Sequence, residues 1–95
     1  MAKFKIAHIK EQGRDLIIVP LESSFEHKSK EEQSKTVLGL QACATSAGLA
    51  GVVVPIWEYG GSFRFIAPKN WHAFFLSPGI YQRLLASINK ELACE

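Results

Sequence analysis

The sequence contains a run of 22 residues, from Thr36 to Trp57, without one charged side chain. A membrane-spanning helix needs about 20 predominantly apolar residues, so the run has to be weighed as a span. It contains Gln41 and Pro55, and its second half is rich in β-branched residues, which favour strands. Gly48 and Gly51 are typical of the end of a helix. We therefore predict a helix that ends at these glycines and a following strand that is buried on both faces, and no membrane span.

The length and composition are those of an ordinary soluble domain. The chain has 95 residues, of which 47% are hydrophobic and 21% are charged. A chain of this size forms one hydrophobic core, so we predict a single domain over residues 1–95. The composition excludes a disordered tail and a disulfide-dense miniprotein. The net charge of +2 indicates no strongly charged partner.

The N-terminus and the two cysteines bear on the cellular compartment. Lys3, Lys5 and Lys10 interrupt any apolar stretch near the N-terminus, so the sequence predicts no signal peptide. Cys43 and Cys94 lie far apart and fit no CxxC or zinc-binding spacing. We predict that both thiols are reduced, with Cys43 a small core residue and Cys94 in a frayed end, and that the protein is cytoplasmic.

Residues 3–10 and 15–21 predict a first hairpin, because both segments are rich in apolar residues and Gln12-Gly13 can form the turn between them. The register places Lys10 opposite Asp15, a favourable cross-strand pair. Pro20 cannot donate a ladder hydrogen bond, so it marks a strand end or an edge. The same register predicts one core face, formed by Phe4, Ile6, Ile17, Val19 and Leu21.

Two capping boxes compete to begin the first helix, Ser23 with Glu26 and Ser29 with Glu32. We favour Ser29, because helical spacing of apolar residues begins only at Val37. Small residues keep this helix thin, which allows it to lie close to a sheet. Its predicted apolar stripe consists of Val37, Leu40, Ala44 and Ala47.

Residues 52–67 predict a second hairpin around Gly60-Gly61, because both glycines can adopt the positive φ that a two-residue turn requires. The register places Tyr59 opposite Ser62 and Trp57 opposite Arg64. Both faces of this hairpin are largely apolar. One face carries Val52, Val54, Ile56, Phe63, Phe65 and Ala67, and the other carries Val53, Pro55, Trp57, Tyr59, Arg64 and Ile66.

The last third of the chain predicts helical structure. Trp71, Phe74 and Phe75 fit a short turn after Pro68, and Ser77-Pro78 is typical of a helix start. Apolar residues then recur at helical spacing, namely Tyr81, Leu84, Leu85, Ile88 and Leu92.

The element order is therefore ββαββα, which predicts an α+β fold. We expect a mostly antiparallel four-stranded sheet, built from the two hairpins, with two helices packed on its principal face. A short helical turn precedes the second helix. Two arrangements stay open at this point: the hairpins lie side by side in one sheet, or they exchange between subunits.

The second face of the second hairpin is the candidate binding surface. It is covered by the last helix, by a ligand or by another subunit. Trp, Tyr and Arg are the residue types that most often dominate the binding energy of protein interfaces. We predict a small non-enzymatic protein-interaction or regulatory module that forms a homodimer or binds another protein partner. The predicted interface residues are Val53, Trp57, Tyr59, Arg64 and Ile66.

Two other functions remain as alternatives. In a small-molecule binding domain, Trp57, Tyr59, Trp71 and His72 would line an apolar pocket. Weak nucleic-acid binding is the other, because aromatic residues alternate around Arg64 as they do in RNA-binding strands. Scattered basic residues and the low net charge argue against it. No phosphate loop, zinc signature or nucleophile motif is present, so we predict no catalytic residue, no metal and no cofactor.

Overall fold

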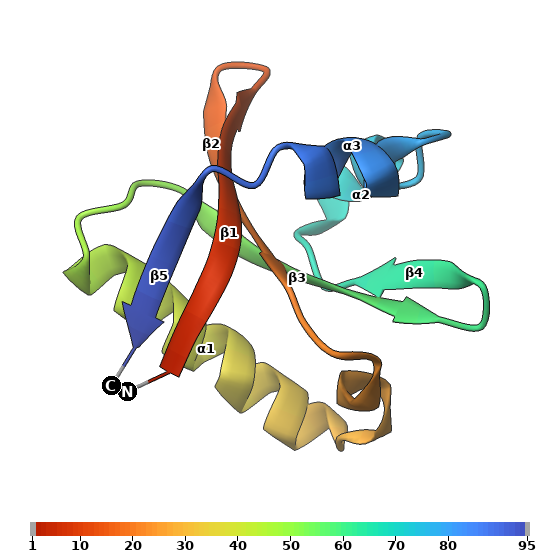
Figure 1. Ribbon diagram of the computed structural model, residues 1–95, viewed down its shortest axis with the longest axis horizontal. Coiled ribbons are helices and arrows are strands. Elements are labelled where there is room, and N and C mark those ends of the chain that lie inside the picture. The colour runs from red at the N-terminus through yellow and green to blue at the C-terminus, as the bar shows by residue number, and fades with distance from the viewer. Residues whose placement is uncertain (1, 95) are drawn as a thin grey trace.

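The computed structural model describes residues 2–94, which form a five-stranded sheet with helical elements on both faces (Figure 1). The strands are β1 (Ala2–Glu11), β2 (Arg14–Pro20), β3 (Val52–Tyr59), β4 (Ser62–Phe65) and β5 (Lys90–Cys94). The helical elements are η1 (Ser23–His27), α1 (Lys30–Ser46), η2 (Lys69–Trp71), α2 (His72–Phe75) and α3 (Ile80–Ala86). The strand order in the sheet is β4-β3-β2-β1-β5.

The predicted α+β class is confirmed, but the sheet is mixed and has five strands instead of four. The two hairpins lie side by side and are joined by a parallel pair, in which Leu16 of β2 lies opposite Val52 of β3. Parallel neighbours need a long crossover, and η1 and α1 supply it here. The predicted register of the first hairpin is confirmed, with Lys10 opposite Asp15.

The fifth strand occupies residues that the apolar spacing assigned to the last helix. After α3 ends, the Asn89 side chain accepts from the N–H of His8 (2.9 Å) and donates to the His8 carbonyl (3.0 Å). The N–H of Asn89 donates to the carbonyl of Ile6 (3.0 Å). The chain is thereby held beside β1, and Leu92 lies opposite Phe4. The prediction that Leu92 belongs to the last helix is wrong. A single apolar residue at helical spacing is equally compatible with a short strand, so the spacing could not distinguish the two.

The predicted packing of both helices on one principal face is wrong. The helices lie on opposite faces of the sheet (Figure 1). Ile17 and Ile18 are neighbours on β2, yet they belong to different cores. The core under α1 contains Ile6, Ile17, Val19, Leu40, Ala44, Val53 and Leu92, with the predicted Phe4 and Leu21 packed against it. The core under the C-terminal helices contains Ala7, Leu16, Ile18, Val54, Ile56, Trp71, Phe75, Ile80 and Leu84. Two-sided burial explains why β2 and β3 are continuous apolar runs.

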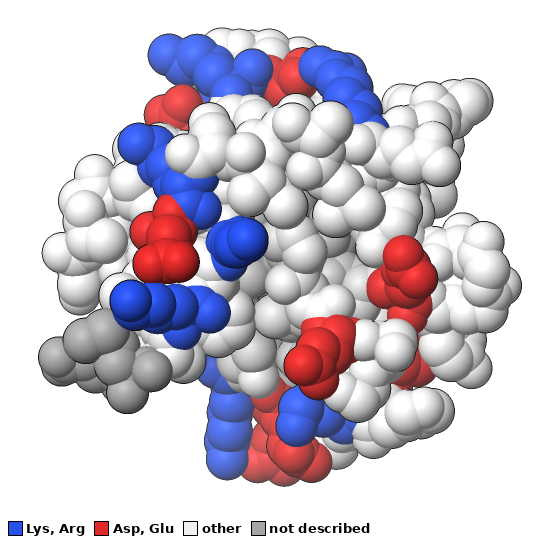
Figure 2. All heavy atoms as spheres, in the orientation of Figure 1, with Lys and Arg blue, Asp and Glu red and all other residues white. Residues whose placement is uncertain are grey.

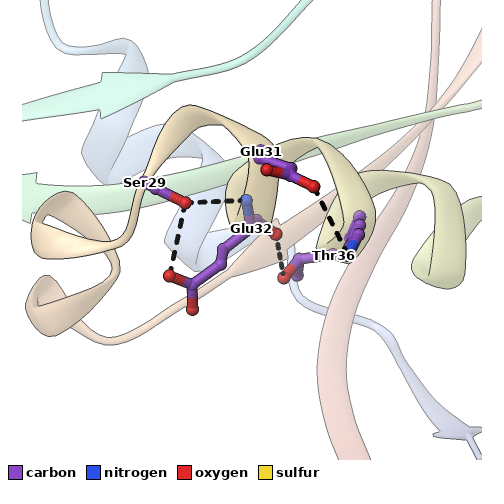
Figure 3. A network of polar contacts seen from close by, with 5 residues as sticks. Ser29, Glu31, Glu32 and Thr36 are labelled. Atoms are coloured by element: carbon purple, nitrogen blue, oxygen red, sulfur yellow. Dashed lines mark hydrogen bonds and ion pairs between the residues drawn. The ribbon is translucent and has the colours of Figure 1, made fainter.

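Ser29 caps α1, as predicted (Figure 3). Its hydroxyl accepts from the N–H of Glu32 (3.1 Å) and donates to the Glu32 carboxylate (3.3 Å). The Thr36 hydroxyl donates to the carbonyl of Glu32 (3.0 Å), and Lys35 pairs with Glu31 one turn earlier (3.6 Å). The Ser29 hydroxyl satisfies one of the free amides of the first turn and so fixes where the helix begins.

The short turn predicted after Pro68 is confirmed as η2 and α2. The helix start predicted at Ser77-Pro78 is wrong. The Ser77 hydroxyl donates to the carbonyl of Ala73 (3.1 Å) and so closes the preceding turn. α3 begins only after Gly79, whose φ of 73° suits glycine.

The uncharged run divides between α1 and β3 as predicted, and Gly48 has a φ of 78° just after the helix. None of the helices within residues 2–94 combines the length and the apolar character that a membrane span requires. Gln41 joins the two halves of the run. Its Nε2 donates to the carbonyl of Gly51 (3.0 Å), and its Oε1 accepts from the N–H of Val53 (2.9 Å).

Replacing Gly51 with alanine is expected to lower the free energy of unfolding by at least about 2 kcal/mol. Gly51 has a φ of 128°, and an added Cβ would lie 2.8 Å from the backbone oxygen of Asp15. Urea denaturation followed by circular dichroism measures the change. Gly39→Ala is the matched control, because Gly39 is exposed in α1 with nothing within 4 Å of an added Cβ. It should stabilise the protein by about 1 kcal/mol. Equal effects of the two variants would contradict the close approach at Gly51.

The two cysteines form a disulfide, Cys43–Cys94, which joins α1 to β5. The prediction of two reduced thiols is wrong, and so is that of a frayed Cys94, which pairs with Ala2 of β1. Because the two cysteines are cross-linked, they no longer support the predicted cytoplasmic location. The spacing of the cysteines could not reveal this pair, because β5 itself was missed.

Candidate functional site

The second hairpin has the predicted register. Tyr59 lies opposite Ser62, and Trp57 lies opposite Arg64. Gly60 and Gly61 have φ values of 60° and 78°, which form the tight two-residue turn. Because side chains alternate between faces, Trp57, Tyr59 and Arg64 share the face on the α1 side of the sheet.

The chain itself covers two of the predicted interface residues on this face. Val53 is 2% exposed and lies in the core under α1. Trp57 is 4% exposed, and its ring meets Phe25 of η1 edge to face, with centroids 4.8 Å apart. Its indole N–H donates to the Glu26 carboxylate (2.9 Å). The cover comes from α1 and η1, and the last helix packs on the other face.

Tyr59 and Arg64 are exposed at the end of the same face, and Ile66 beside them is partly exposed. The Arg64 guanidinium lies 4.9 Å from the centroid of the Tyr59 ring and pairs with Glu26 (3.3 Å). The Glu26 side chain is 22% exposed and receives both Arg64 and the Trp57 indole through one oxygen, Oε1. This carboxylate therefore fixes the Arg64 side chain on the rim of the covered area. Sequence reasoning missed Glu26, because its spacing from Ser23 indicated a helix cap.

These residues border a surface hollow of about 690 Å³, termed here the polar hollow. Charged side chains stand around it, and its apolar part includes Trp57, Ile66 and the two β4 residues Phe63 and Phe65. Its lining includes Glu26, Lys30, Gln33, Tyr59, Arg64 and Ile66. The polar hollow lies at the edge of the sheet, since β4 is the first strand in the order.

A second hollow of about 580 Å³ lies on the opposite face of β4, termed here the aromatic hollow. Phe63 stacks on Tyr81 with centroids 4.8 Å apart, and Phe65 stacks on Phe75 at 5.1 Å. The Tyr81 hydroxyl donates to Glu58 (3.2 Å). Burial raises the pKa of Tyr81, and the negative charge of Glu58 raises it further. Tyr81 therefore stays a neutral hydrogen-bond donor.

The remaining predicted site residues, Trp71 and His72, belong to the other face of the sheet. Trp71 is 4% exposed in the core under the C-terminal helices. His72 is exposed, its Nε2 lies 3.0 Å from the carbonyl oxygen of Ala67, and its ring meets Phe65 edge to face. The sheet separates both residues from Trp57 and Tyr59. The four aromatic residues of the small-molecule alternative therefore do not line one pocket.

The charged side chains are spread unevenly over the surface. Figure 2 shows Lys and Arg interleaved with Asp and Glu along the left, top and bottom of the view, acidic side chains at the right, towards the β3–β4 hairpin, and a largely uncharged area towards α2 and α3. In the described part of the chain, no group of three or more His, Cys, Asp or Glu side chains could hold a metal ion.

Comparison with known proteins gives no relative. No family model matches the chain, and neither a curated protein nor a solved structure is significantly similar to it.

Proposed function

We propose that this chain is a non-enzymatic protein-interaction module that forms a homodimer through the β3–β4 hairpin. The observation that carries the proposal is the accessible group of Tyr59, Arg64 and Ile66, placed beside a hollow at the sheet edge. Tyr and Arg are enriched at the centres of interfaces. Val53 and Trp57 belong to the predicted surface only as its support, because α1 and η1 cover them.

The Arg64–Glu26 pair makes this group suitable for binding. A free arginine loses side-chain entropy when a partner immobilises it. Here the ion pair to Glu26 and the contact with the Tyr59 ring already restrict Arg64 before a partner arrives. Arg64 would therefore provide the polar anchor of the interface, while Ile66 and the Tyr59 ring would provide apolar area.

Replacing Arg64 with alanine is expected to weaken self-association about 30-fold, which corresponds to about 2 kcal/mol for a residue that anchors an interface. Sedimentation velocity over a range of micromolar concentrations measures the effect. Arg83→Ala is the matched control, because Arg83 also pairs with a glutamate, Glu11 (2.6 Å), but on α3 and β1. It should leave association unchanged. A wild-type chain that stays monomeric at all concentrations would refute the proposed homodimer.

A further inference from the structure

We propose that the second copy binds by antiparallel pairing of its β4 with β4 of the first, so that two five-stranded sheets become one. This inference rests on the proposed homodimer and specifies how it forms. The order of strands leaves β4 with a neighbour on one side only, β3. Such an edge is a template for another strand.

The turn decides which backbone groups of β4 face outward. In a hairpin with a two-residue turn, the closing pair is hydrogen-bonded, and hydrogen-bonded and non-bonded pairs then alternate. Ser62 and Arg64 therefore bond to β3, and the N–H of Ile66 continues this phase by donating to the carbonyl of Pro55 (3.2 Å). The N–H and carbonyl groups of Phe63 and Phe65 point away from β3.

Space for an added strand exists on both sides of this edge. Ser62, Phe63 and Phe65 line the aromatic hollow and also the polar hollow. The two hollows therefore meet along β4, one on each face of the sheet. A strand laid along the edge would place alternate side chains in the two hollows.

The sequence of β4 matches this arrangement. A two-fold axis perpendicular to the sheet relates two antiparallel edge strands, so each face of one copy continues into the same face of the other. Phe63 and Phe65 of the second copy would extend the aromatic side, where Leu76 is 71% exposed. Arg64 of the second copy would extend the polar side. This self-complementary pattern is why we assign the edge to a second copy.

The charges also fit a two-fold arrangement. Pairing Phe63 of each copy with Phe65 of the other gives four backbone hydrogen bonds and places the two Arg64 residues opposite each other. Directly opposed like charges destabilise a sheet. Here each Arg64 is accompanied by its own Glu26, which uses only Oε1 for the contacts described. Two arginines and two glutamates would therefore alternate across the axis.

Amide hydrogen exchange followed by NMR tests the pairing without any substitution. The amides of Phe63 and Phe65 are expected to exchange at least about tenfold more slowly in the dimer than in dilute, monomeric protein. Ser62 and Arg64 are internal controls in the same strand, because their amides already bond to β3 and should change little. Each exchange rate is measured at a protein concentration where the dimer forms and at a dilute one where the chain is monomeric, under otherwise identical conditions.

The outcomes separate the two proposals. A dimer whose Phe63 and Phe65 amides gain no protection would overturn the strand pairing but leave the homodimer in place. Equal protection of all four amides would also overturn it, since the alternation is its signature. A chain that never dimerises would overturn both the pairing and the proposed function.

Discussion

Reduction of the Cys43–Cys94 disulfide is expected to lower the free energy of unfolding by about 4 kcal/mol. The two cysteines are 51 positions apart, so the disulfide closes a long loop and removes much of the conformational entropy of the unfolded chain. Urea denaturation with and without a reductant measures the difference. The protein concentration should be low enough to keep the chain monomeric, because association would add to the apparent stability.

A Cys43→Ala/Cys94→Ala variant provides the control. It should unfold at the same urea concentration as the reduced wild-type protein, and reductant should not affect it. If oxidised and reduced wild-type protein unfolded at the same urea concentration, the cross-link would contribute nothing to stability.

Replacing Trp57 with alanine is expected to lower the free energy of unfolding by about 3–5 kcal/mol, the usual range for a large buried aromatic residue. The substitution removes the contact with Phe25 and leaves a cavity between β3 and η1. It also removes the indole donor of Glu26. Far-UV circular dichroism during urea denaturation is a suitable measurement, since it does not depend on tryptophan fluorescence.

Tyr59→Ala separates the covered part of this face from its accessible part. Tyr59 is 42% exposed, two residues along the same strand from Trp57, and its loss should cost less than about 1 kcal/mol. If Trp57→Ala and Tyr59→Ala lowered the free energy of unfolding equally little, the packing of η1 on Trp57 would not contribute to the core. Trp57 would then again be a candidate interface residue.

The local parts of this fold are predictable from the sequence. In each hairpin, a two-residue turn that contains glycine joins the strands and fixes their register. Lys10 therefore lies opposite Asp15, and Trp57 lies opposite Arg64, as expected. The cap at Ser29 is predictable for the same reason, because its contacts lie within one helical turn. Each of these features depends on residues close in sequence.

The features that depend on distant residues were missed. The parallel pairing of β2 and β3 leaves no local pattern beyond two apolar runs. β5 is held by Asn89 and by pairing with β1, and neither is visible from the residues around Leu92. The disulfide was not predicted either, because Cys94 is brought to Cys43 only by the pairing of β5 with β1.

The candidate site was predictable only in part. Apolar residues on both faces of the second hairpin correctly indicated cover on two sides. The source of the cover was not predictable, since Phe25 and Glu26 belong to a polar segment without helical spacing. The aromatic hollow was also missed, because Phe63 and Tyr81 are brought together only when α3 returns over β4.

The arrangement of the strands has a consequence for the order of folding. The strands of each hairpin are close in sequence. In contrast, Leu16 pairs with the distant Val52, and Phe4 pairs with Leu92 across almost the whole sequence. Contacts between distant residues slow folding, because the entropy of closing a large loop is lost before the contact is gained. We therefore expect hairpins to form early and β5 to dock last. The Cys43–Cys94 disulfide would then form only after β5 has docked, at the last step of folding.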